Sequence, residues 1–589
     1  MVLQSMCIPS IMSADLQPLY YRGQATLEDH SLFVPQGQEI SFDTYFHLFS
    51  VKTWREYTVV EKLSVQVNVS GAGNAVLIGF DHDPAQQKQI SSIAFSTETQ
   101  TAFTLLNETA LCELPLHLYI RIKSENGAVR VYSASYTCDK ASAQDVHIAC
   151  CFCTYKREKE LIRNILNLFG GIMQNHDSPL YGRIEIYITD NGHTLTRNML
   201  PASKSIHIFQ NKNYGGSAGF TRCMIEAVLN NPPGTFSHVV LMDDDAIITP
   251  YTVEKTGVIA ALLKPEHREK MIGGAMLWQE KPNIQLENGA FIDPKSWRIR
   301  LPGKDRDLSD LQAVLANEEN ARVNYNGWFY CCIPSETITP DNLPLPLFLH
   351  ADDQEYGVRN KAGILLMNGI CIWHPNTWAK KRAYIEYYDA RNGMIALSKT
   401  NPKMPPWQVC LRELVSVLCF MLSYRYDDAE YTLRGYEDFY KGPEWFMTQD
   451  PEQLNRELMQ WKKEEPCELT KEEMIKLDRI GETKRIRRIT KKTLNMLLPS
   501  FMKRKAFDTN LPWKCISPFC VGEICVIDAE TGKGFCLKKS YGRHFRLILK
   551  TLRSFFFIFR NHQTIYANWN KHAWRMGKQG YWEALLKLK

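Results

Sequence analysis

Residues 239–248 have the sequence Val-Val-Leu-Met-Asp-Asp-Asp-Ala-Ile-Ile, an apolar run that ends in three adjacent carboxylates. This pattern predicts a buried strand that brings acidic side chains to the edge of a sheet. Alternate side chains of a strand share a face, so we expect Asp243 and Asp245 on one side and Asp244 on the other. Because adjacent carboxylates repel one another in a poorly solvated cleft, a divalent cation is the simplest counter-ion. A solvated turn is the alternative, although two isoleucines directly afterwards are untypical of a polar loop.

Three further apolar runs, each followed by polar residues or glycines, precede the acidic stretch. They occupy residues 146–153, 184–188 and 206–209, and a helical pattern follows the first of them. Strand, turn and helix in this order are typical of a parallel α/β domain, which binds ligands beyond the carboxyl ends of its strands. The glycine-rich segment 213–219 leads into a helix, so its backbone amides can face a phosphate group. A tight turn is the other explanation for this glycine cluster.

A second acidic cluster follows the apolar run 343–349 and contains Asp352 and Asp353. Asp353 can act as a base in a cleft, and helix N-capping is the alternative role for these acids. Further along, an apolar strand ends at His374. A lone histidine is more often structural, but this one follows two acidic clusters in the same domain, which favours a metal ligand.

Aromatic residues are dense between 324 and 334, where Trp328 follows a glycine. Aromatic rings of this kind stack on sugar faces, and core packing is an equally common role for them. A polar stretch between about 279 and 320 contains Glu287.

The chain on either side of this α/β region has a different texture. Residues 1–145 alternate with period two and predict a β-sandwich of jelly-roll type, which either binds carbohydrate or acts as a packing module, the role that we favour. Residues 401–589 are mostly helical, with basic amphipathic stretches near 484–498 and 543–560 that suit an anionic membrane surface or an ordinary solvated helix face. Four cysteines there lack the paired short spacing of a zinc site, and we interpret them as structural thiols: Cys515, Cys520, Cys525 and Cys536.

Composition sets broad limits. A chain of 589 residues with 44% hydrophobic content is expected to form several domains, and a net charge of +6 does not select among nucleic acid, membrane and anionic substrates. Seventeen cysteines without an evident secretory leader predict reduced thiols in a cytosolic setting. We expect no membrane span, because the most apolar segment, 545–559, is interrupted by arginine and lysine.

The motifs together resemble a family. An α/β domain whose fourth strand ends in Asp-X-Asp is similar to family 2 glycosyltransferases of the GT-A fold, which are Rossmann-like. With the strand-rich N-terminal module, the Gly-Trp-Phe-Tyr-Cys-Cys-Ile-Pro motif at 327–334, the Asp-Asp-Gln-Glu-Tyr-Gly motif at 352–357 and Trp373-His374, the chain resembles bacterial galactofuranosyltransferases that polymerise galactan. The resemblance covers about residues 40–400. The changes in sequence pattern along the chain predict domains at 1–145, 146–400 and 401–589. The family often has two successive tryptophans where this chain has Trp328-Phe329, which bears on the acceptor and linkage.

The resemblance implies a role for each matching residue. Asp243, Asp245 and His374 correspond to ligands of Mn²⁺ or Mg²⁺, and Asp353 corresponds to the base that deprotonates the acceptor hydroxyl. The nucleotide-sugar donor is expected at Thr154, Arg157, Asp190, Asn213, Gly216, Gly219 and Asp244. The glycan acceptor is expected at Trp328, Asp352 and Glu287.

The expected reaction is transfer of galactofuranose from UDP-galactofuranose to a glycan or lipid-linked glycan, with inversion, at the inner face of the plasma membrane. Direct displacement needs one base and no covalent nucleophile. Nucleic acid is not an expected partner, and oligomeric state stays open. Alternative donors are UDP-galactopyranose, UDP-glucose or a dTDP-sugar. A non-catalytic glycan-binding protein would not need two acidic strand ends and a histidine, and a phosphohydrolase usually needs a second metal set.

Overall fold

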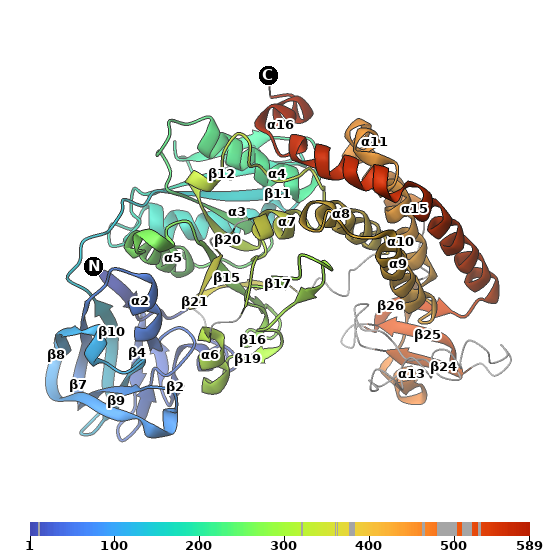
Figure 1. The fold of residues 1–589 in the computed structure, drawn as a ribbon. Helices are drawn as coiled ribbons and strands as arrows, with labels where there is room; N and C mark the ends of the chain where they lie inside the picture. The colour runs from blue at the N-terminus through green and yellow to red at the C-terminus, as the bar shows by residue number, and fades with distance from the viewer. Residues whose placement is uncertain are drawn as a thin grey trace.

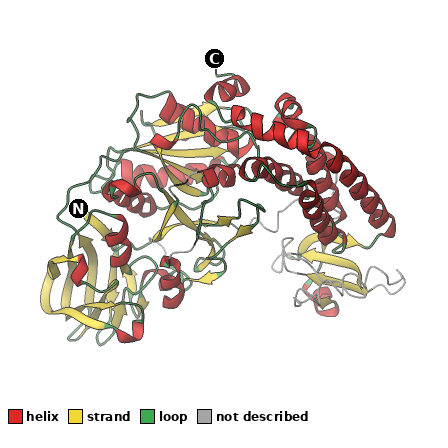
Figure 2. Ribbon diagram, in the orientation of Figure 1, coloured by secondary structure: helices red, strands yellow, loops and turns green. Residues whose placement is uncertain are grey.

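The structure is a computed structural model that describes residues 1–9, 12–319, 322–359, 361, 363–375, 383–461, 466–479, 504–508, 521–527 and 532–588. Figures 1 and 2 show a strand-rich N-terminal part, a central sheet with helices against it, and a helical C-terminal part with a small sheet beside it. The predicted multidomain organisation, with extensive sheet and a helical C-terminal part, is therefore confirmed.

The N-terminal part is one ten-stranded antiparallel sheet that bends around its own core. Strand β7 makes this possible, because residues 64–70 pair with β10 while residues 73–80 pair with β9. At the transition, Gly71 has φ +102°, and a Cβ there would lie 2.2 Å from the Ala128 carbonyl oxygen. The two predicted layers thus share one long strand. The strands are β1 (Val2–Ser5), β2 (Arg22–Gly23), β3 (Thr26–Glu28), β4 (Ser31–Val34), β5 (Glu39–Ser41), β6 (Phe49–Ser50), β7 (Lys62–Phe80), β8 (Lys88–Ala110), β9 (His117–Ser124) and β10 (Val129–Thr137).

The central sheet has the order β13-β12-β11-β14-β20-β15-β16-β19, and β21 pairs with β15. Its first four strands are parallel and are nearly continuous apolar runs, as expected for strands covered on both faces. The strands are β11 (Ile148–Thr154), β12 (Ile184–Asp190), β13 (Ile206–Gln210), β14 (His238–Asp243), β15 (Met271–Trp278), β16 (Ile284–Glu287), β19 (Arg306–Asp307), β20 (Tyr330–Pro334) and β21 (Ile364–His374). The accompanying helices are α3 (Glu158–Leu168), α4 (Gly215–Met224), α5 (Pro250–Leu262), α6 (Leu311–Glu318) and α7 (Asp352–Arg359).

Strand register aligns the predicted site residues at one edge of this sheet. Thr154 is opposite Asp190, and Cys153 is opposite Asp243. The carboxyl ends of β11, β12 and β14 therefore meet at one level, as the strand pattern predicted.

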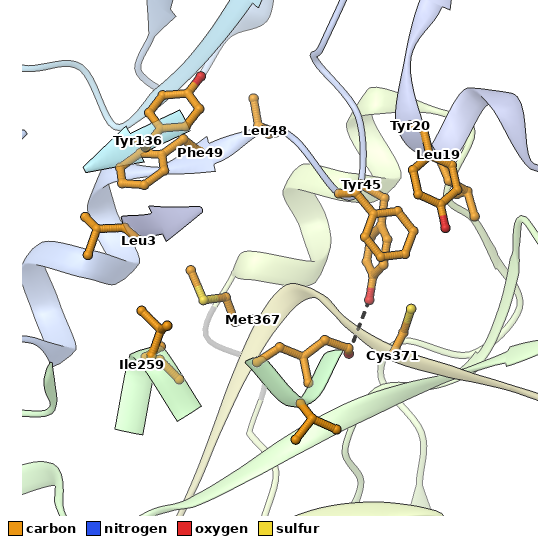
Figure 3. Packing of buried hydrophobic residues seen from close by; sticks show 14 of the residues in the cluster. Leu3, Leu19, Tyr20, Tyr45, Leu48, Phe49, Tyr136, Ile259, Met367 and Cys371 are labelled. Atoms are coloured by element: carbon orange, nitrogen blue, oxygen red, sulfur yellow. Dashed lines mark hydrogen bonds between the residues drawn. The ribbon is translucent and has the colours of Figure 1, made fainter. Parts of the chain in front are cut away.

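The N-terminal part packs directly on the central sheet through a continuous apolar core. Figure 3 shows Leu3 and Phe49 near Ile259 of α5 and Met367 of β21. The Tyr45 hydroxyl donates to the Ile370 carbonyl oxygen at 3.5 Å. This contact lies on the strand that ends at His374, so the packing module also supports the site.

The C-terminal part consists mainly of helices, which are α8 (Ile385–Thr400), α9 (Pro406–Met421), α10 (Tyr426–Phe439), α11 (Gly442–Thr448), α12 (Pro451–Trp461), α15 (Tyr541–Met576) and α16 (Gln579–Leu586). Helix α8 packs with α9, α10 and α15, so the helical layer begins before residue 401. A five-stranded sheet that the sequence did not predict is formed by β22 (Pro466–Glu468), β23 (Asp478–Arg479), β24 (Arg504–Asp508), β25 (Val521–Ile527) and β26 (Lys533–Lys538).

The two predicted basic stretches have different outcomes. The stretch at 484–498 lies outside the described residues, as do Cys515 and Cys520, whereas 543–560 falls within α15. Among the helices that the structure describes, none is both long enough and apolar enough to cross a bilayer.

Candidate active site

The three adjacent aspartates diverge because β14 ends at Asp243 and the chain then turns. The Asp244 carboxylate accepts hydrogen bonds from the Thr154 hydroxyl at 2.7 Å and from Arg157 at 3.0 Å. Arg157 also lies 2.8 Å from Oδ2 of Asp245. The guanidinium therefore joins two of the three acids, and the other oxygen of Asp245 is directed at a different partner.

That partner is His374, at the end of β21. Its Nε2 atom lies 3.2 Å from Oδ1 of Asp245 and 3.7 Å from Oδ2 of Asp243. An isolated bridge between Ile247 and Trp373 brings the end of β21 against the turn after β14. Long-range strand pairing thus assembles a group that is spread over the sequence.

The chemistry of this group fits a divalent cation. One ligand atom each from Asp243, Asp245 and His374 all lie within 4.8 Å of one another. Burial and the neighbouring Asp245 charge raise the pKa of Asp243 to about 7. Burial lowers the pKa of His374, but its bond to Asp245 and the Asp243 charge outweigh this and raise it to about 9. The imidazolium therefore supplies positive charge at a place where Mn²⁺ or Mg²⁺ would have two oxygen ligands and one nitrogen ligand.

Asp190 is buried and its carboxylate is engaged by the backbone. It accepts N–H bonds from Gly192, Thr194 and Leu195 at 2.8–2.9 Å. Asp190 lies at the edge where the nucleotide was predicted, and its carboxylate holds the loop beyond β12 in place.

The glycine-rich segment joins the two halves of the site. Gly219 is a packing position, because a Cβ there would lie 2.1 Å from Sγ of Cys153 on β11. Gly216, in the first turn of α4, faces the second acidic cluster, since a Cβ at this position would be 3.8 Å from Oδ2 of Asp352. The Asn213 side chain accepts the Gly215 N–H at 3.4 Å. The helix N-terminus and the second acidic cluster are therefore neighbours.

The second acidic cluster opens helix α7. Burial raises the pKa of Asp352 to about 6. Burial, followed by the charge of Asp352 and then that of Glu287, raises the pKa of Asp353 well above its ordinary value. Burial also raises the pKa of Glu287 to about 7, against the opposing charge of Lys304. Three carboxyl groups therefore share a poorly solvated region, which makes each of them a better proton acceptor once ionised.

The two acidic clusters face a common space next to β11. Cys153 is half-buried; desolvation of its thiol raises its pKa, and the charges of Asp244, Asp243 and Asp352 raise it further. Helix α4 joins them, because Gly219 packs on the Cys153 sulfur and Gly216 faces Asp352, so both clusters lie at the same edge of the sheet.

The segment before Asp352 has an unusual backbone that helix α8 holds in place. Phe348, His350 and Ala351 all have φ between 61° and 72°, the left-handed region that non-glycine residues rarely adopt. The Asn392 amide donates to the carbonyl oxygens of Leu347, Leu349 and His350 at 2.8–3.0 Å. Sequence reasoning did not identify Asn392. No local pattern marks it, because the carbonyl oxygens that it binds lie 42–45 residues earlier in the chain.

Two other predicted residues have clear structural positions. Trp328 is only 5% exposed, and its ring makes edge contacts with Phe220 and Tyr356 at centroid distances of 5.6 and 6.0 Å. The ring lies in the core between α4 and α7, and little of its surface is open to a sugar. Glu287, by contrast, is half-buried at the end of β16 and acts on Asp353.

Comparisons with known proteins agree with the resemblance. Residues 9–109 match the family described as galactofuranosyltransferase 2 N-terminal. The chain is 25% identical over 445 residues to galactofuranosyltransferase GlfT2 of Mycobacterium tuberculosis, which covers 70% of this chain and 67% of that protein. It is 24% identical over 445 residues to the GlfT2 of Mycolicibacterium smegmatis, covering 70% and 66%. These similarities support a glycosyltransferase that is related to galactofuranosyltransferases and spans about two thirds of their length.

Solved structures add little. The C-terminal CBM6 of LamC from Zobellia galactanivorans, for example, has a TM-score of 0.15 and 10% identity, and covers 20% of this chain and 91% of that one.

Proposed function

We propose that this chain is a metal-dependent, inverting glycosyltransferase that moves galactofuranose from UDP-galactofuranose to a hydroxyl of a growing cell-surface glycan. The observation that carries the proposal is the convergence of two acidic clusters on one sheet edge. Asp243, Asp245 and His374 come together there, and Asp352 lies at the same edge, beside Gly216 in the first turn of α4. The similarity to two galactofuranosyltransferases supports the sugar. We further propose that the central sheet is a GT-A domain.

The cation-binding group serves the donor. A divalent ion bound by Asp243, Asp245 and His374 would act as a Lewis acid that stabilises charge on the departing diphosphate. Arg157 fixes the orientation of Asp244 and Asp245 by binding both carboxylates, at 3.0 and 2.8 Å. The first turn of α4, at Gly216, offers backbone N–H groups to phosphate oxygens.

Asp353 serves the acceptor. Its carboxylate takes the proton of the acceptor hydroxyl while that oxygen forms a bond to the anomeric carbon. The bond from this carbon to the diphosphate oxygen breaks, and UDP leaves with the electron pair. A single displacement of this kind inverts the anomeric centre and needs no covalent enzyme intermediate.

The test uses purified chain, Mn²⁺ or Mg²⁺, and a panel of UDP-galactofuranose, UDP-galactopyranose, UDP-glucose and a dTDP-sugar, with synthetic or lipid-linked glycan acceptors. UDP release and product mass report transfer. We expect transfer from UDP-galactofuranose that is lost in Asp245→Ala and kept in Asp139→Ala, a matched change at an exposed aspartate of the N-terminal part. Transfer only from a pyranose donor would overturn the sugar assignment.

We also propose that the helical part binds an anionic membrane surface, as a peripheral protein of the inner face of the plasma membrane. Helix α15 exposes a stripe of apolar side chains at three- and four-residue spacing, and α9, which packs beside it, exposes a second stripe. Arginine and lysine alternate with these residues along α15. Apolar side chains flanked by basic ones suit the headgroup region of a bilayer, where a lipid-linked acceptor would be held. The exposed residues are Phe545, Leu549, Leu552, Phe556 and Phe559 of α15 and Trp407, Leu411 and Val415 of α9.

A further inference from the structure

The small C-terminal sheet has two chemically different faces. Ile524, Val526 and Leu537 point from β25 and β26 into a core shared with helices α9, α10 and α15. Cys525 and Ile527 alternate with them and so point to the opposite face. The helices therefore cover one face, and among the described residues the other face carries a small apolar cluster of its own.

Strand register gathers three cysteines on that second face. Cys525 of β25 is directly opposite Cys536 of β26. Cys467 of β22 is opposite Gly534, which lies two residues before Cys536 on β26 and therefore on the same face. The three cysteines thus occupy neighbouring positions on three adjacent strands, β22, β26 and β25.

The distances among the three sulfurs suit a shared ligand. The Sγ atoms of Cys525 and Cys536 are 3.3 Å apart, and all three sulfurs lie within 4.8 Å of one another. A disulfide requires a separation of about 2.05 Å. Three thiolates bound to one tetrahedral zinc at about 2.3 Å each would lie roughly 3.8 Å apart. The observed cluster is therefore close to the geometry of a thiolate metal site and open by more than an ångström relative to a disulfide.

We propose that Cys467, Cys525 and Cys536 bind a structural zinc ion, a second metal centre that is independent of the Asp-Asp-His group. Thiolates favour soft or borderline cations such as zinc, whereas the carboxylates of the other group favour Mn²⁺ or Mg²⁺. Zinc binding would release the protons of the three thiols, and a fourth ligand would complete the tetrahedron. The ion would tie β22 to β25 and β26, in addition to the small apolar cluster that the described residues form on this face.

This proposal departs from the interpretation of Cys525 and Cys536 as structural thiols. Zinc sites are usually recognised by two short cysteine pairs, and ten residues separate these two. The third cysteine, Cys467, lies much earlier in the sequence than the other two. The pairing of β22 with β26 brings it beside them. The three cysteines are brought together by the pairing of β22, β26 and β25, which cannot be read from the cysteine spacing in the sequence.

The test begins with the metal content of full-length chain purified under reducing conditions without chelator. We expect about one zinc per chain, reduced at least several-fold in Cys467→Ser, Cys525→Ser and Cys536→Ser. Cys112→Ser, at an exposed cysteine of the N-terminal part, is the matched control and should keep the zinc. A His374→Ala variant should keep it as well, which separates this centre from the Asp-Asp-His group.

Two measurements on the unmodified chain remain decisive if a serine variant fails to fold. Cobalt(II) added to zinc-depleted chain should give the intense charge-transfer absorption of thiolate ligands. The three cysteines should resist alkylation until a chelator is added, as read by mass spectrometry of peptides. Absence of thiolate–cobalt absorption, chelator-independent alkylation, or a Cys525–Cys536 disulfide in chain purified under reducing conditions would each overturn the proposal.

Discussion

The Nε2 atom of His374 lies 3.2 Å from Oδ1 of Asp245, although one residue ends β21 and the other follows β14. Because the same imidazole is 3.7 Å from Asp243, it lies between two carboxylates that repel each other. Without a metal ion, the protonated imidazole offsets one of these two negative charges. Metal binding would then have to displace the proton, so affinity for a divalent cation should increase with pH as His374 becomes neutral.

Removing the imidazole should weaken metal binding. His374→Ala deletes one of three candidate ligands, and we expect the dissociation constant for Mn²⁺ to rise by on the order of 100-fold, at least as much as loss of a supporting residue costs in metal sites. Titration calorimetry at neutral pH measures it. His238→Ala, at a buried histidine near the opposite end of β14, is the control, and equal Mn²⁺ affinity in all three proteins would contradict the assignment.

The acid limb of the pH–rate profile should reflect the ionisation of the Asp353 carboxyl group. The pKa of this carboxyl is raised by burial first and then by the negative charge of Asp352. A base acts only when ionised, so kcat/KM should increase with pH through this raised pKa. Asp352→Asn removes the neighbouring charge and should move the acid limb to lower pH. An acid limb that stays in place in this variant would show that Asp352 does not act on the base.

Asn392 should position the segment that leads to the base. Its amide binds three carbonyl oxygens of residues 347–350, so Asn392→Ala leaves one buried and two partly buried acceptors without this donor. We expect a loss of about 1–3 kcal/mol in unfolding free energy and a lower kcat with little change in the KM for donor. Asn570→Ala, which removes a single bond to the Ser398 carbonyl oxygen, is the matched control. A kcat in Asn392→Ala no lower than in the control would contradict a positioning role.

Buried Glu413 of α9 should make the helical part less stable at high pH. Burial raises its pKa from 4.5 to about 8, and the Ser554 hydroxyl donates to it at 2.8 Å. The folded state holds this proton more tightly than the unfolded state. The contribution of Glu413 to the free energy of unfolding is therefore largest below about pH 4.5 and is lost as the pH rises to about 8. Glu413→Gln should therefore be more stable than the parent at pH 8 by on the order of a few kcal/mol, with a smaller difference at pH 5. Denaturant unfolding at both pH values tests the sign.

The apolar stripe of α15 should bind anionic liposomes. Replacing Phe545, Phe556 and Phe559 with serine removes side chains that are 59–72% exposed, so folding should be little affected. We expect co-sedimentation with phosphatidylglycerol vesicles to fall several-fold, and binding of the parent to weaken in high salt. Unchanged sedimentation would contradict a membrane role, and a dimer that the triple variant converts to monomer would assign the stripe to a second copy of the chain.

The local sequence pattern was enough to predict which strands end at the site. It was not enough to predict the contacts between side chains from different elements. Apolar runs with polar ends predicted β11, β12 and β14, and with them the level of Thr154, Asp190 and Asp243. The hydrogen bonds from Asn392 to residues 347–350 and the burial of Trp328 depend on elements that are distant in sequence. The C-terminal sheet was not predicted, because β22, β23 and β24 are short, and β22 and β23 lie far from β25 and β26 in the sequence.

In the proposed reaction, the group of Asp243, Asp245 and His374 binds the donor with its metal ion, and a separate carboxylate, Asp353, accepts the proton. The most direct test measures UDP binding in the presence of Mn²⁺, together with turnover of UDP-galactofuranose, for Asp245→Asn and Asp353→Asn. We expect Asp353→Asn to bind UDP and Mn²⁺ as tightly as the parent but to turn over at least 100-fold more slowly, whereas Asp245→Asn should lose both binding and turnover. Full turnover by Asp353→Asn, or unchanged Mn²⁺-dependent UDP binding by Asp245→Asn, would contradict the proposed reaction.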